Sequence, residues 1–168
     1  MQGVLRPLRV VILAAAGLLF ILATSAGMPE VAATRFGGAG EPNAFMTRFG
    51  YQVFMAFLVT VVPLLVAFLP RLVGGRWPYL LNIPHRTYWL APERREATLA
   101  AVEAHTAFLA TILILLICYV HWLLMQANAA NPPRLDIGLF FAGMGVFAVV
   151  LAAWIVRLFR RFSRPRPG

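Results

Sequence analysis

Four long apolar segments dominate the pattern of hydrophobic and polar positions, and charged, glycine and proline residues gather between them. A helix needs about 20 apolar residues to cross a hydrocarbon core of roughly 30 Å, because each residue rises about 1.5 Å. A bilayer offers the backbone no water, so each spanning segment must be helical. The segments of this length are residues 10–28, 49–69, 106–125 and 137–156. The pattern predicts an all-α membrane protein, a four-transmembrane-helix bundle forming one integral membrane domain over residues 1–168.

The first segment has a second interpretation as a signal peptide. Arg6 and Arg9 precede its apolar stretch, and Thr24 and Ala26 occupy the positions three and one before a possible cleavage site. We expect the segment to be retained as a transmembrane span.

Arginine is distributed unequally between the two sides of the predicted membrane. Twelve arginines flank one side, and the other side has only Arg35, Arg48 and Arg134. An excess of positive charge marks the cytoplasmic side. The twelve are Arg6, Arg9, Arg71, Arg76, Arg86, Arg94, Arg95, Arg157, Arg160, Arg161, Arg164 and Arg166. We therefore expect a multi-pass protein of the bacterial inner membrane with both its amino and carboxyl ends in the cytoplasm.

Composition agrees with a membrane protein. Of the 168 residues, 61% are hydrophobic and 12% are charged, whereas soluble domains have roughly 25% charged residues. The formal charge of +9 is read first as a signal of topology, and we expect no nucleic-acid partner. Every basic residue other than histidine is arginine, a bias typical of GC-rich bacterial genomes.

The loop between the second and third spans, residues 70–105, is predicted to be structured and cytoplasmic. Pro92 and Glu93 suit the first turn of a helix, which would then continue into the third span. Tyr88 and Trp89 fit either a docking surface for a partner or an anchor at the lipid headgroups. The candidate partner-binding residues are Tyr88, Trp89, Pro92, Arg94 and Arg95.

The residues that could carry chemistry are few. His105 and His121 lie roughly 160° apart around one helix and more than about 20 Å apart along it, so they cannot share a metal ion. No carboxylate or lysine lies within a span, which disfavours an intramembrane hydrolase and a proton relay. We expect no catalytic site, no metal and no cofactor, and the sequence leaves open whether either histidine has more than a structural role.

The basic tail, residues 157–168, is expected to attract anionic headgroups, at about 1 kcal/mol per charge. Its candidate lipid-binding residues are Arg157, Arg160, Arg161, Arg164 and Arg166. In the adjoining fourth span, Gly138 and Ala142 have the small-xxx-small spacing that permits close helix contact.

The outer loop, residues 28–48, contains a proline, an aromatic residue, a glycine turn and a short polar run: Pro29, Phe36, Gly40, Glu41, Pro42 and Asn43. This order resembles a motif of a bacterial four-span membrane-protein family, defined by a domain of unknown function, whose domain also forms the amino-terminal part of Sdp-type immunity proteins. Residues 82–95 and 120–128 look like segments of its short proteobacterial members. The family commonly has histidine before the aromatic residue, where this chain has Arg35. The resemblance implies the four-span fold, with immunity or signalling as an analogy. The last five of the six motif residues, from Phe36 to Asn43, are the candidate outer-loop residues.

Three functions remain open. The favoured hypothesis is a non-enzymatic accessory or scaffold subunit of a larger membrane complex, whose partners are other membrane-protein subunits and membrane lipids. The first alternative is an envelope sensor or immunity protein of the Sdp type. The second is a small-molecule transporter, for which His121, Gln52, Thr60 and Thr111 are the polar residues that could begin a path.

Overall fold

The structure is a computed structural model that describes residues 2–77, 81 and 83–163. Arg164 and Arg166, two of the candidate lipid-binding residues, lie outside the described residues. In chain order the elements of the described part are α1 (Gln2–Ser25), β1 (Val31–Phe36), β2 (Pro42–Thr47), α2 (Arg48–Arg76), α3 (Arg86–Trp89), α4 (Pro92–Ala129) and α5 (Ile137–Phe162).

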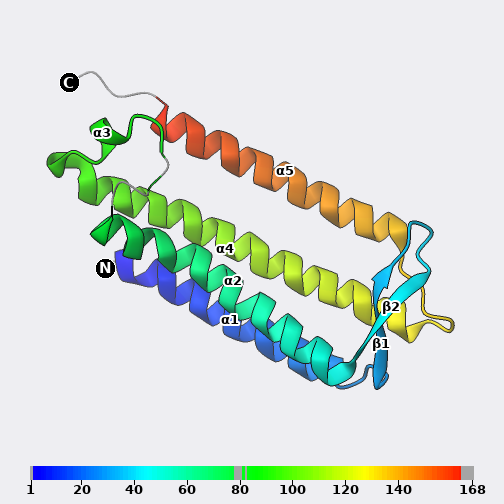
Figure 1. Cartoon of the computed structure of the whole chain (residues 1–168). Helices are drawn as coiled ribbons and strands as arrows, with labels where there is room; N and C mark the ends of the chain where they lie inside the picture. The colour runs from blue at the N-terminus through cyan, green and yellow to red at the C-terminus, as the bar shows by residue number, and fades with distance from the viewer. Residues whose placement is uncertain (1, 78–80, 82, 164–168) are drawn as a thin grey trace.

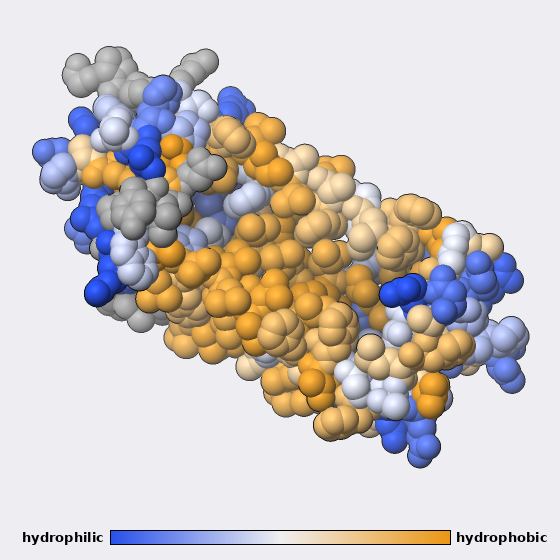
Figure 2. Space-filling view, in the orientation of Figure 1, coloured by the Kyte–Doolittle hydropathy of each residue, from blue (hydrophilic) through white to orange (hydrophobic). Residues whose placement is uncertain are grey.

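Four of the helices in this part of the chain, α1, α2, α4 and α5, are long and apolar enough to cross a membrane. The chain is therefore a mostly helical, multi-pass membrane protein. Figure 2 shows an apolar band over the middle of the visible face and polar residues gathered at both ends of the bundle.

Side-chain caps mark the starts of α2 and α5. The hydroxyl of Thr47 accepts a hydrogen bond from the Gly50 amide at the start of α2, and the Asp136 carboxylate accepts one from the Leu139 amide at the start of α5. These side chains satisfy amides that have no partner within the helix. Helix α4 starts with Pro92, at the predicted position, and runs without interruption to Ala129.

Helices α1, α2 and α4 form the compact part of the bundle, and α5 lies along α4 on the side away from α1 and α2 (Figure 1). The core contains small and branched side chains from α1, α2 and α4, among them Ala14, Ile21, Val59, Ala110 and Ile114. None of the most apolar window of α5 is buried. The fourth span is therefore peripheral.

The outer loop folds as an antiparallel β-hairpin, which the sequence did not predict. Val31 pairs with Thr47 and Ala33 with Phe45, and the register becomes irregular between Ala33 and Phe36. The amide of Gly37 donates to the Glu41 carbonyl, at 2.8 Å, and closes the turn.

The hairpin lies at one end of the bundle, and the described ends of the chain lie with α3 at the other end (Figure 1). This agrees with an even number of spans. The side of the membrane on which each end lies stays a prediction from the arginine distribution.

Two segments predicted as loop or tail are largely helical. Helix α2 continues to Arg76, beyond the predicted end of the second span, and α4 begins at Pro92 as predicted, so helices occupy much of residues 70–105. Helix α5 continues to Phe162, which places Arg157, Arg160 and Arg161 on its last turns. The polar residues there continue the helical backbone beyond the apolar segment.

Candidate functional site

A polar cluster lies buried between α1, α2 and α4 at the hairpin end of the bundle. The His121 ring is fully buried, and its two nitrogens lie 2.7 Å from the Thr24 hydroxyl and 2.6 Å from the Tyr51 hydroxyl. Thr24 also donates to the Phe20 carbonyl. The Tyr51 side chain is itself only 2% exposed.

A second pair of polar side chains adjoins this cluster. The Gln52 amide donates to the hydroxyl of the fully buried Ser25, at 2.9 Å. In the described part of the chain no buried side-chain nitrogen or oxygen lacks a partner. Since a satisfied polar network in a low-dielectric interior favours one geometry, the cluster fixes how α1, α2 and α4 meet below the hairpin.

Asn128, on the last turn of α4, holds the hairpin. Its side-chain oxygen accepts from the Ala33 amide at 2.8 Å, and its nitrogen donates to the Ala33 carbonyl at 2.9 Å. Ala33 is 1% exposed. The amide side chain thus satisfies both polar groups of a buried strand residue, as a neighbouring strand would.

Gly40 connects the hairpin turn to the segment before α5. Its φ is +83°, and a Cβ there would overlap the carbonyl oxygen of Leu135. The Leu135 amide donates to the Gly40 carbonyl at 2.9 Å. Glycine is required at this turn because the backbone is left-handed and the Leu135 backbone approaches too closely for a side chain.

Arg48 joins the start of α2 to the end of α1. Its guanidinium donates to the carbonyls of Ala26 and Met28, at 3.1 and 3.0 Å. The hairpin is therefore held by α4, by Arg48 at the start of α2 and by the segment before α5, and it forms a fixed platform at one end of the bundle.

The candidate outer-loop residues divide into a structural and an exposed group. Gly40 is buried, and the Glu41 carboxylate accepts from the Ala39 amide within the turn. Asn43 is exposed, as are Arg35 and the neighbouring Phe45. Phe36 is half-buried beside an apolar hollow that also contains Phe140 of α5. The exposed residues are those that a ligand of the outer face could contact.

At the opposite end, Trp89 attaches the loop before α4 to the end of α5. Its indole nitrogen donates to the Phe162 carbonyl at 2.9 Å, and its ring packs edge-on against the Phe162 ring. The Thr98 hydroxyl donates to the Trp89 carbonyl. Trp89, predicted as a partner contact, is thus engaged within the protein.

The other predicted contacts of this loop differ in how far they are exposed. The Arg94 guanidinium lies 4.2 Å from the centre of the Tyr88 ring, a cation–π arrangement. Arg95 donates to the Gly74 carbonyl of α2 at 3.1 Å. Pro92 and Arg94 are exposed. A partner could therefore contact the exposed Pro92 and Arg94, whereas Tyr88 packs against Arg94 and Arg95 holds α4 against α2.

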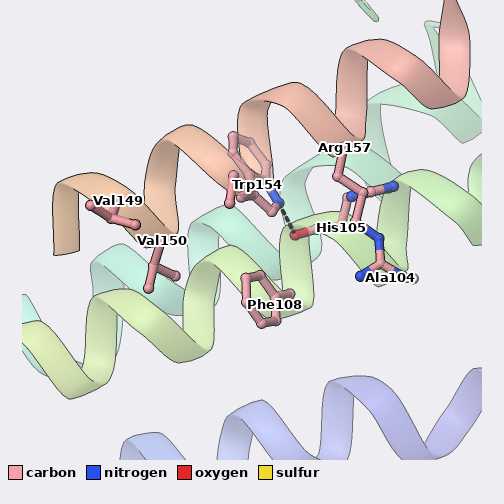
Figure 3. Close-up of a pocket in the computed structure, with 8 residues that line it drawn as sticks. Ala104, His105, Phe108, Val149, Val150, Trp154 and Arg157 are labelled. Carbon is pink, nitrogen blue, oxygen red and sulfur yellow. Dashed lines mark hydrogen bonds between the residues drawn. The ribbon is translucent and has the colours of Figure 1, made fainter. Parts of the chain in front are cut away.

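An apolar groove separates part of α4 from α5. Near the termini its walls include His105 and Phe108 of α4 and Val149, Val150, Trp154 and Arg157 of α5 (Figure 3). The Trp154 indole donates to the His105 carbonyl at 2.9 Å and connects the two helices. His105 therefore contributes its backbone to a helix contact.

Polar side chains that could have lined a transport path are engaged locally. The hydroxyls of Thr60 and Thr111 donate to carbonyls of their own helices, and Gln52 and His121 belong to the buried cluster. Among the described residues, no three histidine, cysteine, aspartate or glutamate side chains come together in a group that could hold a metal ion.

Sequence reasoning missed Asn128 and the role of Tyr51. An amide in the last turn of a span was the available signal for Asn128. The residues around Tyr51 in the sequence do not show whether its hydroxyl contacts lipid headgroups or is buried as a hydrogen-bond partner of His121.

The fold defines a multi-pass helical membrane protein with a β-hairpin platform at one end of its bundle. Comparison with protein-family models, with curated proteins and with solved structures gives no match to this chain. The resemblance to the Sdp-related family therefore stays a prediction from the sequence.

Proposed function

We propose that the protein is a non-enzymatic accessory or scaffold subunit of a larger complex in the bacterial inner membrane, with its termini in the cytoplasm. The observation that carries this proposal is the peripheral position of α5. A span that packs chiefly on one neighbour leaves most of its circumference for another membrane protein.

The outward face of α5 has the composition of a helix-packing surface. A Cβ at Gly143 would overlap the Tyr119 ring of α4, so Gly143 marks the inward face. At about 100° per residue, Gly138, Gly145, Ala148 and Ala152 lie 140° to 220° from it. All four are exposed, and a Cβ at Gly145 meets nothing within 4 Å. Small residues let a second transmembrane helix approach closely.

This geometry changes the predicted small-residue pair. Ala142 lies on a flank of α5, where it lines the groove beside α4. The outward small-residue face instead uses Gly138 with Gly145 and the two alanines. At the end of the bundle near the termini, the exposed Pro92 and Arg94 supply a second surface for the same partner.

Native purification tests the proposal. The tagged protein, extracted from its own membranes in mild detergent, should migrate with a partner on native gels. Ala148→Leu should release that partner because it fills the outward face. Ala15→Leu is the matched control, since Ala15 is exposed on α1. A wild-type protein recovered only as an isolated monomer would contradict the proposal.

The outer hairpin favours a second candidate, an envelope sensor or immunity protein. Asn128, Gly40 and Arg48 each fix its backbone, while Arg35, Asn43 and Phe45 are exposed. A preorganised platform with exposed polar and aromatic groups is suited to recognising a ligand, because little ordering entropy is lost on binding.

Gene deletion distinguishes the two candidates. If the protein is an immunity factor or sensor, cells without it become more sensitive to an envelope toxin, and Asn43→Ala combined with Phe45→Ala does not restore resistance. If it is a subunit, sensitivity is unchanged and a specific membrane complex is lost.

A further inference from the structure

The groove between α4 and α5 continues well beyond the part drawn in Figure 3. A section of about 450 Å³ near the termini and a section of about 430 Å³ toward mid-bundle share Val150 as a wall. The second section runs past Leu115 and Tyr119 of α4 and Val146 of α5. Both sections are lined chiefly by aliphatic and aromatic side chains.

Positive charge lies at only one end of this groove. Arg157 lines its termini end, is exposed, and forms no hydrogen bond or ion pair with another residue that the structure describes. No acidic side chain lines either section. The nearest carboxylate along α4, Glu103, pairs with Arg71 of α2 at 3.3 Å.

The groove extends along α5 from Arg157 to Ala142, which is deeper than one leaflet, and Val146 lies about one leaflet below Arg157. Arg157 and Val146 are separated by eleven residues of α5, or about 16 Å at 1.5 Å per residue. Half of a hydrocarbon core of ~30 Å is about 15 Å. A lipid whose phosphate lies at Arg157 would therefore place the methyl end of an acyl chain near Val146 and Leu115.

We propose that this groove binds one anionic glycerophospholipid, with an acyl chain between α4 and α5 and its phosphate on Arg157. The inference does not depend on the proposed subunit function, which uses the opposite face of α5. The guanidinium forms paired, charge-assisted hydrogen bonds to phosphate. The negative charge of the headgroup distinguishes the lipid from the neutral lipids that surround the protein.

Native mass spectrometry of the full chain tests the charge requirement. Delipidated protein is incubated with an equimolar mixture of dioleoylphosphatidylglycerol and dioleoylphosphatidylethanolamine. The wild type should retain one phosphatidylglycerol. Arg157→Gln should lower its retention about fivefold, the factor expected for one interfacial arginine. Arg9→Gln is the matched control, because Arg9 is exposed on α1 at the same end of the bundle and lines neither section of the groove. Equal retention of the two lipids, or equal losses in the two variants, would overturn the proposal.

A pair of alanine substitutions tests the groove itself. Ala153 lines the groove and Ala152 does not line either section, and both are exposed. Ala153→Phe should abolish retention of phosphatidylglycerol, whereas Ala152→Phe should keep it. Both variants should keep the wild-type helical circular dichroism. Retention that is unchanged in Ala153→Phe, or a second protein chain bound in place of the lipid, would refute a lipid in this groove.

Discussion

Replacing Asn128 with leucine should release the hairpin from α4 while leaving the helices in place. Leucine has a similar size but removes the acceptor for the Ala33 amide and the donor to the Ala33 carbonyl. Leaving a buried polar group without a partner costs about 1–3 kcal/mol. Two such groups give about 2–4 kcal/mol after allowance for water reaching the edge of the hairpin. The hairpin should therefore open about 30-fold more often, or more.

Hydrogen exchange measured by mass spectrometry in lipid nanodiscs is the appropriate assay. Peptides covering residues 31–47 should exchange faster by that factor, and peptides from α1 and α2 should not change. Gln126→Leu is the control, because Gln126 is an exposed amide on the same helix. If Asn128→Leu and Gln126→Leu gave the same exchange rates in the hairpin, the hydrogen bonds from Asn128 to Ala33 would not be what holds strand β1.

Three further predictions concern two glycine positions and the topology. Gly40→Ala should destabilise the hairpin by about 1–2 kcal/mol, because an alanine is strained in the left-handed backbone at this position. Gly38→Ala should be neutral, since a Cβ there meets open space. Equal effects of the two variants on hydrogen exchange in the hairpin would contradict the requirement for glycine at position 40. Gly143→Ala should lower the melting temperature in detergent because its methyl group meets Tyr119, whereas Gly145→Ala should not, and a reversed order would mean that α5 is rotated. A fluorescent protein fused to the carboxyl end should be active, and alkaline phosphatase fused there should be inactive, as expected for a cytoplasmic end. The opposite pattern would place the termini outside the cytoplasm.

The four long helices were predictable because span length and apolarity are local properties. The start of α4 was predictable for the same reason, since Pro92 and Glu93 are a helix-start signal within a few residues of chain. Near the termini, α1, α2 and α5 extend beyond the predicted spans because polar residues continue these helices, whereas α1 ends at Ser25, before the predicted residue 28.

The hairpin was not predictable from local pattern. Strand β1 does not alternate regularly between buried and exposed positions, and the group that satisfies Ala33 comes from a residue 95 positions later. The sequence likewise did not predict which face of α5 packs against α4. A Cβ at Gly143 would overlap the Tyr119 ring of α4, whereas a Cβ at Gly138 would meet only the Asp136 side chain next to its own helix.

The length of α4 has a mechanical consequence. Its 38 residues give a rod of about 57 Å at 1.5 Å per residue, almost twice the thickness of a hydrocarbon core. One end of this rod is bonded to the hairpin through Asn128, and the other begins beside Tyr88 and Trp89. Tilting such a rod by about 5° displaces its ends by roughly 5 Å relative to each other. A displacement of the hairpin would therefore reach the loop at the other end of the bundle through a single continuous helix.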